Sequence, residues 1–204
     1  AQIGLGIAGR CPMGETFEEM VLDRLFLKPA PISTQILPPE PLANFLFACC
    51  LLSASLGQFG RDCRHLMRSE IAEVVEAYET KQVGSSTMGQ KRNPLNLENL
   101  EGMWLRILAE FYKVMLTLIS EHQRDLVGSS VMRDFPIIVV NLQYQLDTLL
   151  RKPEGDATFL SRLTVNPEAC KRNFEQSAKF VLAEPMYIAL LIAGYEGDAH
   201  ELVN

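Results

Sequence analysis

Residues 42–66 read LANFLFACCLLSASLGQFGRDCRHL, and their apolar side chains recur at alternating intervals of three and four residues. This spacing is a heptad pattern, which places an apolar seam along one side of an α-helix. The predicted seam consists of Leu42, Phe45, Cys49, Leu52, Leu56, Phe59, Cys63 and Leu66. The pattern continues one residue out of step through Met67, Ile71 and Val74, and neither Pro nor Gly interrupts it. We therefore expect one long helix over residues 40–79.

Two more seams of the same kind follow along the chain. The second consists of Leu97, Leu100, Trp104, Ile107, Phe111, Val114 and Leu118. The third consists of Val131, Phe135, Ile138, Leu142, Leu146 and Leu149. Ser129 or Ser130 is suited to cap the third helix, and the Lys152-Pro153 pair stops it.

The C-terminal quarter of the chain predicts two shorter helices. Residues 151–165 lose the helical pattern, and Asn166 then precedes Pro167, an arrangement typical of an N-cap and the first helical position. This helix ends near Leu182, and a short helix follows Pro185. Alternation of the kind found in strands never exceeds four residues. The fold class is therefore predicted to be all-α, a long-helix bundle followed by a small helical C-terminal domain.

The same pattern predicts the domain organisation. Residues 1–33 form an N-terminal segment, residues 34–150 the central bundle with a loop over 83–94, and residues 151–204 the C-terminal domain. Helices of this length present more apolar surface than three neighbours within one chain can cover. We therefore expect a homo-oligomer. A monomeric antiparallel bundle is the alternative.

Composition narrows the class of protein. The chain has 204 residues, 48% of them hydrophobic and 22% charged, as expected of a folded globular protein. Its net charge of −6 provides no general attraction for nucleic acid or anionic membranes, so neither is expected as a partner. The apolar run over residues 45–53 is too short for a membrane span. The five cysteines lack C-x-x-C spacing, which predicts buried thiols, no zinc and a cytoplasmic location.

Residues 83–98, VGSSTMGQKRNPLNLE, separate the first two long helices and combine the residue types of an anion-binding loop. Gly84 and Gly89 allow backbone N–H groups to converge on an anion, the Ser and Thr residues between them add hydroxyls, and Lys91 adds charge. The positive end of the following helix dipole lies at the same place. Composition alone leaves a second interpretation open, a flexible Gly/Ser connector.

Residues 123–134, QRDLVGSSVMRD, contain a second candidate anion site. Arg124 precedes the predicted helix start, Ser129 lies at it, and Arg133 follows one turn later, which is an arrangement that suits a phosphate. In the alternative interpretation the two arginines pair with Asp125 and Asp134 on a solvated surface.

The loop resembles the GSSxMPxKxNP signature of the fumarase and aspartase superfamily of lyases. The residues in register are Gly84, Ser85, Ser86, Met88, Lys91, Asn93, Pro94 and Glu98, whereas Gly89 replaces the usual Pro. Within that superfamily the surrounding sequence is most similar to that of the adenylosuccinate lyases. The similar segments are Ser33-Thr34-Gln35, MRSEIAEVVE, EHQRDLVGSSVMRD and VLAEP.

The resemblance implies a role for each matching residue. Ser85 would be the catalytic base, and Lys91 and Asn93 would bind the fumarate-side carboxylate. Glu98 would orient a catalytic histidine of another subunit. Further substrate contacts would come from Thr34, Gln35, Ser86 and Met88. The 5′-phosphate of the nucleotide would be held by Arg124, Ser129 and Arg133.

The resemblance also implies an activity and its requirements. Such lyases release fumarate from adenylosuccinate, and from a related carboxamide ribotide, in purine biosynthesis, without metal or cofactor and as homotetramers with shared active sites. The family's catalytic histidine lies upstream of Thr34, so we expect this chain alone to be an incomplete, inactive fragment. His65, His122 and His200 are expected to be structural. The alternatives are an argininosuccinate lyase, a carboxymuconate cycloisomerase, or a non-catalytic helical assembly module.

Overall fold

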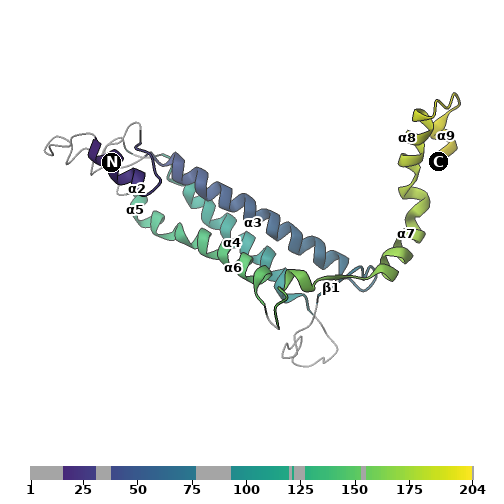
Figure 1. Cartoon of the computed structure of the whole chain (residues 1–204), viewed down its shortest axis with the longest axis horizontal. Coiled ribbons are helices and arrows are strands. Elements are labelled where there is room, and N and C mark those ends of the chain that lie inside the picture. The colour runs from purple at the N-terminus through teal and green to yellow at the C-terminus, as the bar shows by residue number, and fades with distance from the viewer. Residues whose placement is uncertain are drawn as a thin grey trace. The chain divides into compact units, whose positions relative to one another are not determined.

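The computed structural model describes residues 16–30, 38–76, 93–119, 121, 127–152 and 155–203. The chain divides into two compact units. Unit 1 comprises residues 1–60 and 98–148, and unit 2 comprises residues 61–97 and 149–204. The described residues are mostly helical, which confirms the predicted all-α class (Figure 1).

The helices are α2 (Thr16–Arg24), α3 (Glu40–Leu66), α4 (Leu95–Leu116), α5 (Val127–Val131), α6 (Pro136–Leu150), α7 (Pro167–Val181), α8 (Ala183–Ile192) and α9 (Ala199–Val203). Two 3₁₀ turns are η1 (Met132–Asp134) and η2 (Leu160–Arg162). The strands β1 (Val74–Val75) and β2 (Thr164–Val165) form one short antiparallel pair, in which Val74 lies opposite Val165.

The three long helices α3, α4 and α6 run alongside one another in Figure 1. In unit 1 their buried side chains form one hydrophobic core of Ala43, Leu46, Cys49, Cys50, Ile107, Val114, Phe135, Ile138 and Leu142. Gly57 lies against Trp104, and the Phe47 ring lies 5.7 Å from the Phe111 ring. The contacting residues run forward along α3, from Phe47 to Gly57, and backward along α4, from Phe111 to Trp104. The two helices are therefore antiparallel.

The face of α3 that enters this core coincides only in part with the predicted seam. The buried residues of α3 are Ala43, Leu46, Cys49, Cys50, Ser53, Gly57, Gly60 and Cys63, of which only Cys49 and Cys63 belong to the predicted seam. The predicted seam residues Leu42, Phe45 and Leu52 are 40%, 55% and 46% exposed. Small side chains occupy most of the buried face because α3 and α4 approach each other closely. A Cβ atom on Gly57 would lie 3.0 Å from the Cβ atom of Trp104. The predicted seam of α3 was therefore right for Cys49 and Cys63 and wrong for Leu42, Phe45 and Leu52, where the buried face lies about a quarter of a helical turn away.

The predicted seams of α4 and α6 are confirmed. Leu97, Leu100, Ile107 and Val114 are almost completely buried on α4, and Ile138 is equally buried on α6. Their seams contain large aliphatic side chains, whose burial contributes a large hydrophobic free energy to folding.

The start of the third helix differs from the prediction. A separate helix, α5, begins at Val127, and the 3₁₀ turn η1 divides it from α6. Pro136 is the reason, because it has no N–H to donate to the carbonyl four residues earlier. Instead the Phe135 N–H donates to the Met132 carbonyl at 3.2 Å, which is the 3₁₀ pattern.

Helix α3 ends at Leu66, and the predicted extension to residue 79 was wrong. The chain turns at Ala72, which has φ +54°, and the Glu73 N–H donates to the Leu66 carbonyl at 2.9 Å. The Asn173 side-chain amide of α7 then donates to the Ile71 carbonyl and to the Glu73 carboxylate, both at 2.9 Å. These tertiary bonds override the local apolar pattern.

The C-terminal helices follow the prediction closely. Asn166 caps α7, since its Oδ1 accepts from the Ala169 N–H at 3.2 Å and Pro167 occupies the first turn. Helix α8 begins two residues before Pro185 and ends just before Gly194, whose φ of +74° terminates it. The domain boundaries predicted from the sequence remain predictions.

Helix α3 is long and apolar enough to cross a membrane by length and composition alone. One third of its most apolar stretch is buried inside the protein. Core helices of soluble bundles have the same length and composition. The packing of Leu46 against α4 and α6 accounts for the apolar character of this buried face.

A buried polar layer crosses the bundle core. Gln145 on α6 is fully buried, and its Nε2 donates to the Leu100 carbonyl at 2.7 Å and to the Ser53 carbonyl at 3.2 Å. One side chain thereby connects all three long helices. Asn141, one turn earlier, is also buried. The sequence analysis did not anticipate these residues, because the seam rule assigns only apolar side chains to the core.

We predict that Gln145→Ala lowers the free energy of unfolding by about 2–4 kcal/mol, since it removes both bonds and leaves a cavity. Urea denaturation at fixed protein concentration measures this change. Gln143→Ala is the matched control, because Gln143 is exposed on the same helix and bonds only to Asp147 one turn away. Its expected cost is below about 0.5 kcal/mol. Equal effects of the two variants would contradict a bridging role for Gln145.

Candidate functional site

The structure describes Asn93, Glu98, Ser129 and Arg133 among the predicted site residues. The remaining predicted site residues lie outside the described ranges: Thr34, Gln35, Ser85, Ser86, Met88, Lys91 and Arg124. The geometry of the site is therefore built from the residues that flank the signature segment 83–94 and from those that follow α4.

The two chain ends that flank residues 77–92 are tied to each other within unit 2. The Asn96 Nδ2 donates to Oε1 of Glu76 at 2.6 Å, and the Arg151 guanidinium donates to Oδ1 of Asn96 at 2.8 Å. Glu76 is only 5% exposed. One amide thus bridges a buried carboxylate and a guanidinium that comes from the end of α6. These three residues, which we call the anchor, fix the separation of the two flanking ends.

Residues 71–76, which precede the signature segment, make further bonds within unit 2. Strand β1 pairs with β2, and the Asn166 N–H donates to the Glu73 carbonyl at 2.8 Å. The Arg172 guanidinium donates to the Ile71 carbonyl at 3.2 Å, beside the Asn173 bonds described above. Residues 71–76 are therefore held to α7 by backbone and side-chain bonds together.

The two described residues at the start of α4 occupy different environments. Asn93 is half-buried just before the helix, and its carbonyl accepts from the Leu95 N–H at 2.9 Å. Glu98 is exposed in the first turn, where a carboxylate also stabilises the helix dipole. This position suits both the helix-stabilising role and the catalytic role that the resemblance implies.

The second constellation lies in unit 1. Ser129 is half-buried in α5, and Arg133 is exposed in η1, one helical turn later. The two residues are four positions apart but belong to different elements, the α-helix α5 and the 3₁₀ turn η1. Their use as an anion site stays a prediction.

Asp134, the neighbour of Arg133, bonds elsewhere. Its Oδ2 accepts from the Lys113 Nζ at 2.8 Å, and the same Nζ lies 2.7 Å from Oε2 of Glu110. Arg133 makes no ion pair with any residue that the structure describes. The surface pairing of Arg133 with Asp134 that we considered as an alternative is thus not formed.

The Lys113 ammonium donates hydrogen bonds to the carboxylates of Asp134 and Glu110, and these bonds, that with Asp134 first, raise the pKa of Lys113 above its ordinary value. A lysine is charged at neutral pH with or without this shift.

Three of the four described cysteines are buried, and the fourth, Cys170, is half-buried, unlike the expectation of a buried thiol. Cys49, Cys50 and Cys63 are free and buried, which confirms the expectation for these three. Burial, followed by the charge of Cys49, raises the pKa of the Cys50 thiol to about 11. Because the thiolate is the reactive form, Cys50 is a poor nucleophile at neutral pH.

The described ranges contain no group of three or more His, Cys, Asp or Glu residues that could hold a metal ion. His65 is exposed near the end of α3, and the His200 ring packs edge-on against Tyr187 at 6.2 Å. His122 lies outside the described residues.

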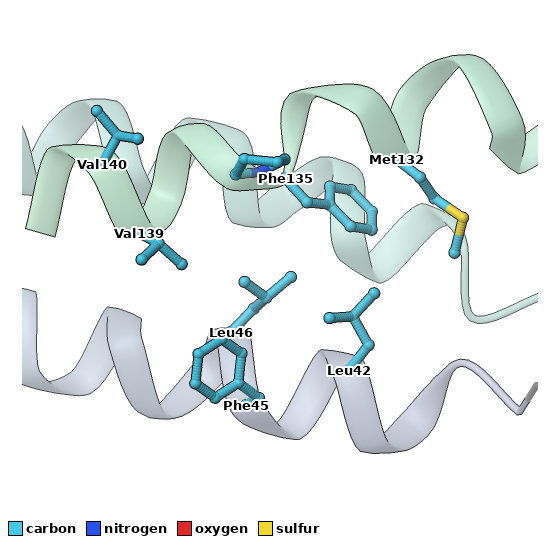
Figure 2. A pocket seen from close by; sticks show the side chains of 8 residues that line it. Leu42, Phe45, Leu46, Met132, Phe135, Val139 and Val140 are labelled. Atoms are coloured by element: carbon cyan, nitrogen blue, oxygen red, sulfur yellow. The ribbon is translucent and has the colours of Figure 1, made fainter. Parts of the chain in front are cut away.

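An apolar pocket of about 460 Å³ opens between α3 and the segment that runs from η1 into α6. Figure 2 shows Leu42, Phe45 and Leu46 on one side facing Met132, Phe135 and Val139 on the other. Leu42 and Phe45 belong to the exposed seam of α3. The pocket thus continues the apolar surface that the bundle core leaves uncovered.

Comparisons with known proteins find similarity between the chain and lyases. Residues 13–109 match the lyase family. The chain is 35% identical over 188 residues to the adenylosuccinate lyase of Pyrococcus horikoshii, which covers 92% of this chain and 40% of that protein. It is 33% identical over 178 residues to the adenylosuccinate lyase of Bacillus subtilis, covering 87% of this chain and 40% of that protein. The chain therefore spans about two fifths of the length of these relatives.

Solved structures support the same fold. The 3-carboxy-cis,cis-muconate lactonizing enzyme of Pseudomonas putida matches with a TM-score of 0.70 and 27% identity, over 94% of this chain and 41% of that one. A fumarate lyase from a Mesorhizobium species matches with a TM-score of 0.68 and 19% identity, over 94% of this chain and 40% of that one. The second likeness concerns the fold alone.

We predict that Asn96→Ala loosens the anchor, because it removes two bonds and leaves the Glu76 carboxylate buried without its amide partner. The expected loss in free energy of unfolding is about 1–3 kcal/mol, together with faster hydrogen exchange at residues 74–76. Asn99→Ala is the matched control, since Asn99 is exposed on the same helix. Unchanged exchange at residues 74–76 in Asn96→Ala would show that the anchor does not hold this strand.

Proposed function

We propose that this chain, which is 35% identical over 92% of its length to an adenylosuccinate lyase, supplies part of an active site that eliminates fumarate from adenylosuccinate. The same site would act on the related carboxamide ribotide of purine biosynthesis. The observation that carries the proposal is the signature over residues 84–98, which is in register in a chain 35% identical to adenylosuccinate lyases.

The chemistry assigned to the signature segment is a proton abstraction followed by loss of the leaving nitrogen. Ser85 is the proposed base, and it takes the proton from the carbon next to a carboxylate. Lys91 and Asn93 bind that carboxylate as negative charge accumulates on it in the transition state. Ser86 and Met88 contribute further substrate contacts. Fumarate then forms as the carbon–nitrogen bond breaks and its electron pair leaves with the nitrogen.

The leaving nitrogen needs a proton, which we assign to a histidine supplied by another subunit. Glu98 is the proposed partner that orients this histidine. Its exposure at the start of α4 favours the assignment, because a side chain in this position is accessible to a second chain. Thr34 and Gln35 are proposed substrate contacts. None of these steps calls for a metal or an organic cofactor.

A nucleotide substrate requires a phosphate site, which we assign to Arg124, Ser129 and Arg133. The placement of Ser129 and Arg133 one turn apart supports the assignment, as does the absence of an ion pair between Arg133 and its neighbour Asp134. A bond from a guanidinium to a phosphate oxygen is among the stronger hydrogen bonds in proteins. Substrates built only of amino acids present no such phosphate.

The proposed assembly is a homotetramer with shared active sites in the cytoplasm. Helix α3 supports oligomerisation, because apolar side chains outside its buried face, among them Phe45, Phe47 and Leu51, are about half exposed. The exposed seam residues Leu42, Phe45 and Leu52 and the adjoining apolar pocket offer a surface for a second copy.

Carboxymuconate cycloisomerase is a second candidate, since a lactonizing enzyme of that type shares 27% identity with the chain. The higher identity to adenylosuccinate lyases and the Arg124, Ser129 and Arg133 set favour the nucleotide substrate. Fumarate release from adenylosuccinate, compared with turnover of carboxymuconate and argininosuccinate, distinguishes the candidates in a complete, active assembly.

We predict that Ser85→Ala in such an assembly lowers kcat by at least about 100-fold and leaves AMP binding intact, because the base acts only in the transition state. Arg133→Ala should instead raise KM and weaken AMP binding by about 1.5–3 kcal/mol, the value of a charge-assisted hydrogen bond. Calorimetry of AMP binding measures both, with Arg106→Ala as a control for charge removal. If Arg133→Ala binds AMP as tightly as the parent does, the phosphate assignment fails.

We predict that the purified chain is oligomeric and that Phe45→Asp shifts it toward smaller species, since burial of a carboxylate at an apolar interface is unfavourable. Light scattering measures the mass. Asn44→Asp is the matched control, because it adds the same charge outside the seam on the same helix. A uniform species of 22.9 kDa in the parent chain would refute the assembly.

A further inference from the structure

Lys113 on α4 forms a close charged group with two carboxylates. Its Nζ lies 2.8 Å from Oδ2 of Asp134 in η1 and 2.7 Å from Oε2 of Glu110 one turn earlier on α4. All three residues belong to unit 1. The pair with Asp134 connects helix α4 to the turn that carries Arg133, across 21 positions of the sequence.

This connection matters because of the position of Asp134 in the chain. Asp134 directly follows Arg133, and an aspartate beside an arginine can form an ion pair with it or repel an approaching anion. In the structure the Asp134 carboxylate is turned to Lys113, and Arg133 makes no ion pair with the described residues. The charge that would oppose an anion is thus neutralised by a third residue.

We propose that Lys113 is a positioning residue for nucleotide binding, which holds and neutralises Asp134 so that Arg133 presents an unopposed positive charge to the phosphate. The inference rests on the proposed function and extends it to a residue outside the signature motifs. Lys113 does not touch the phosphate in this account. Its effect reaches the ligand through Asp134.

The charges in this region make the expected effect specific. Glu110 and Asp134 contribute two negative charges, and Lys113 and Arg133 contribute two positive charges. Loss of the Lys113 charge leaves an excess negative charge beside Arg133, whereas simultaneous loss of the Asp134 charge restores the balance.

The test is calorimetry of AMP binding to the purified oligomer at low and at high salt. Lys113→Met should weaken AMP binding by at least about threefold at low salt, the effect that one unit charge has on another across an assumed separation of about 7 Å at the dielectric constant of water. The effect should shrink at high salt because exposed charges are screened. Lys113→Arg should keep the parental affinity, which also controls for folding.

The double variant Lys113→Met with Asp134→Asn decides the mechanism. If Lys113 acts by neutralising Asp134, the double variant should bind AMP as tightly as the parent. If both Lys113→Met and the double variant bind weakly, Lys113 has only a structural role and the inference is overturned. Parental affinity in Lys113→Met would also overturn it.

The Arg133→Ala variant separates the two proposals. Weak AMP binding in Arg133→Ala, together with unchanged binding in Lys113→Met, retains the phosphate site and rejects only the role of Lys113. Parental binding in Arg133→Ala, or no AMP binding by the parent, rejects the phosphate site itself, and the role of Lys113 falls with it.

Discussion

The close approach of α3 to α4 is the constraint on which the bundle depends. It is made possible by a face of small residues, on which a Cβ atom at Gly57 would come within 3.0 Å of Trp104. Because this face enters the core, the larger side chains of α3, such as Phe45 and Leu52, remain exposed. Gln145 can then reach the backbone of both neighbouring helices with a single amide. The packing of the core, the hydrogen bonds of Gln145 and the exposed apolar surface of α3 thus all follow from the close approach of α3 to α4.

The sequence predicted the fold class and two of the three seams because large aliphatic residues on α4 and α6 are buried within the chain itself. It misplaced much of the buried face of α3 for a physical reason: the seam rule selects the largest apolar side chains, and here small ones are buried in the core while Leu42 and Phe45 remain 40% and 55% exposed. The end of α3 at Leu66 was also missed. It is set by Asn173, which lies far along the chain and leaves no periodic signal.

The sequence likewise identified some residues of the candidate site and missed others. Its motif residues could be recognised in sequence, because each is identified by its spacing to the next. The residues that support them could not, since their partners are distant: Lys113 meets Asp134 across 21 positions, and Arg151 meets Asn96 across 55. Charge pattern alone left the partner of Asp134 undecided between Arg133 and others. The observed pair with Lys113 gives the acid next to Arg133, the residue that we propose binds the phosphate, a partner on another helix.

The bonds between α7 and residues 71–76 have a consequence for the order of folding. Asn173 and Glu73 are separated by 100 residues, and the contact of Thr164 with Val75 spans 89. Closing such long loops costs more entropy than joining α4 to α6, so the nearby helices associate first. During synthesis, α3, α4 and α6 leave the ribosome before α7 does. The bundle therefore assembles early, and the support for the signature segment is completed only when α7 has emerged.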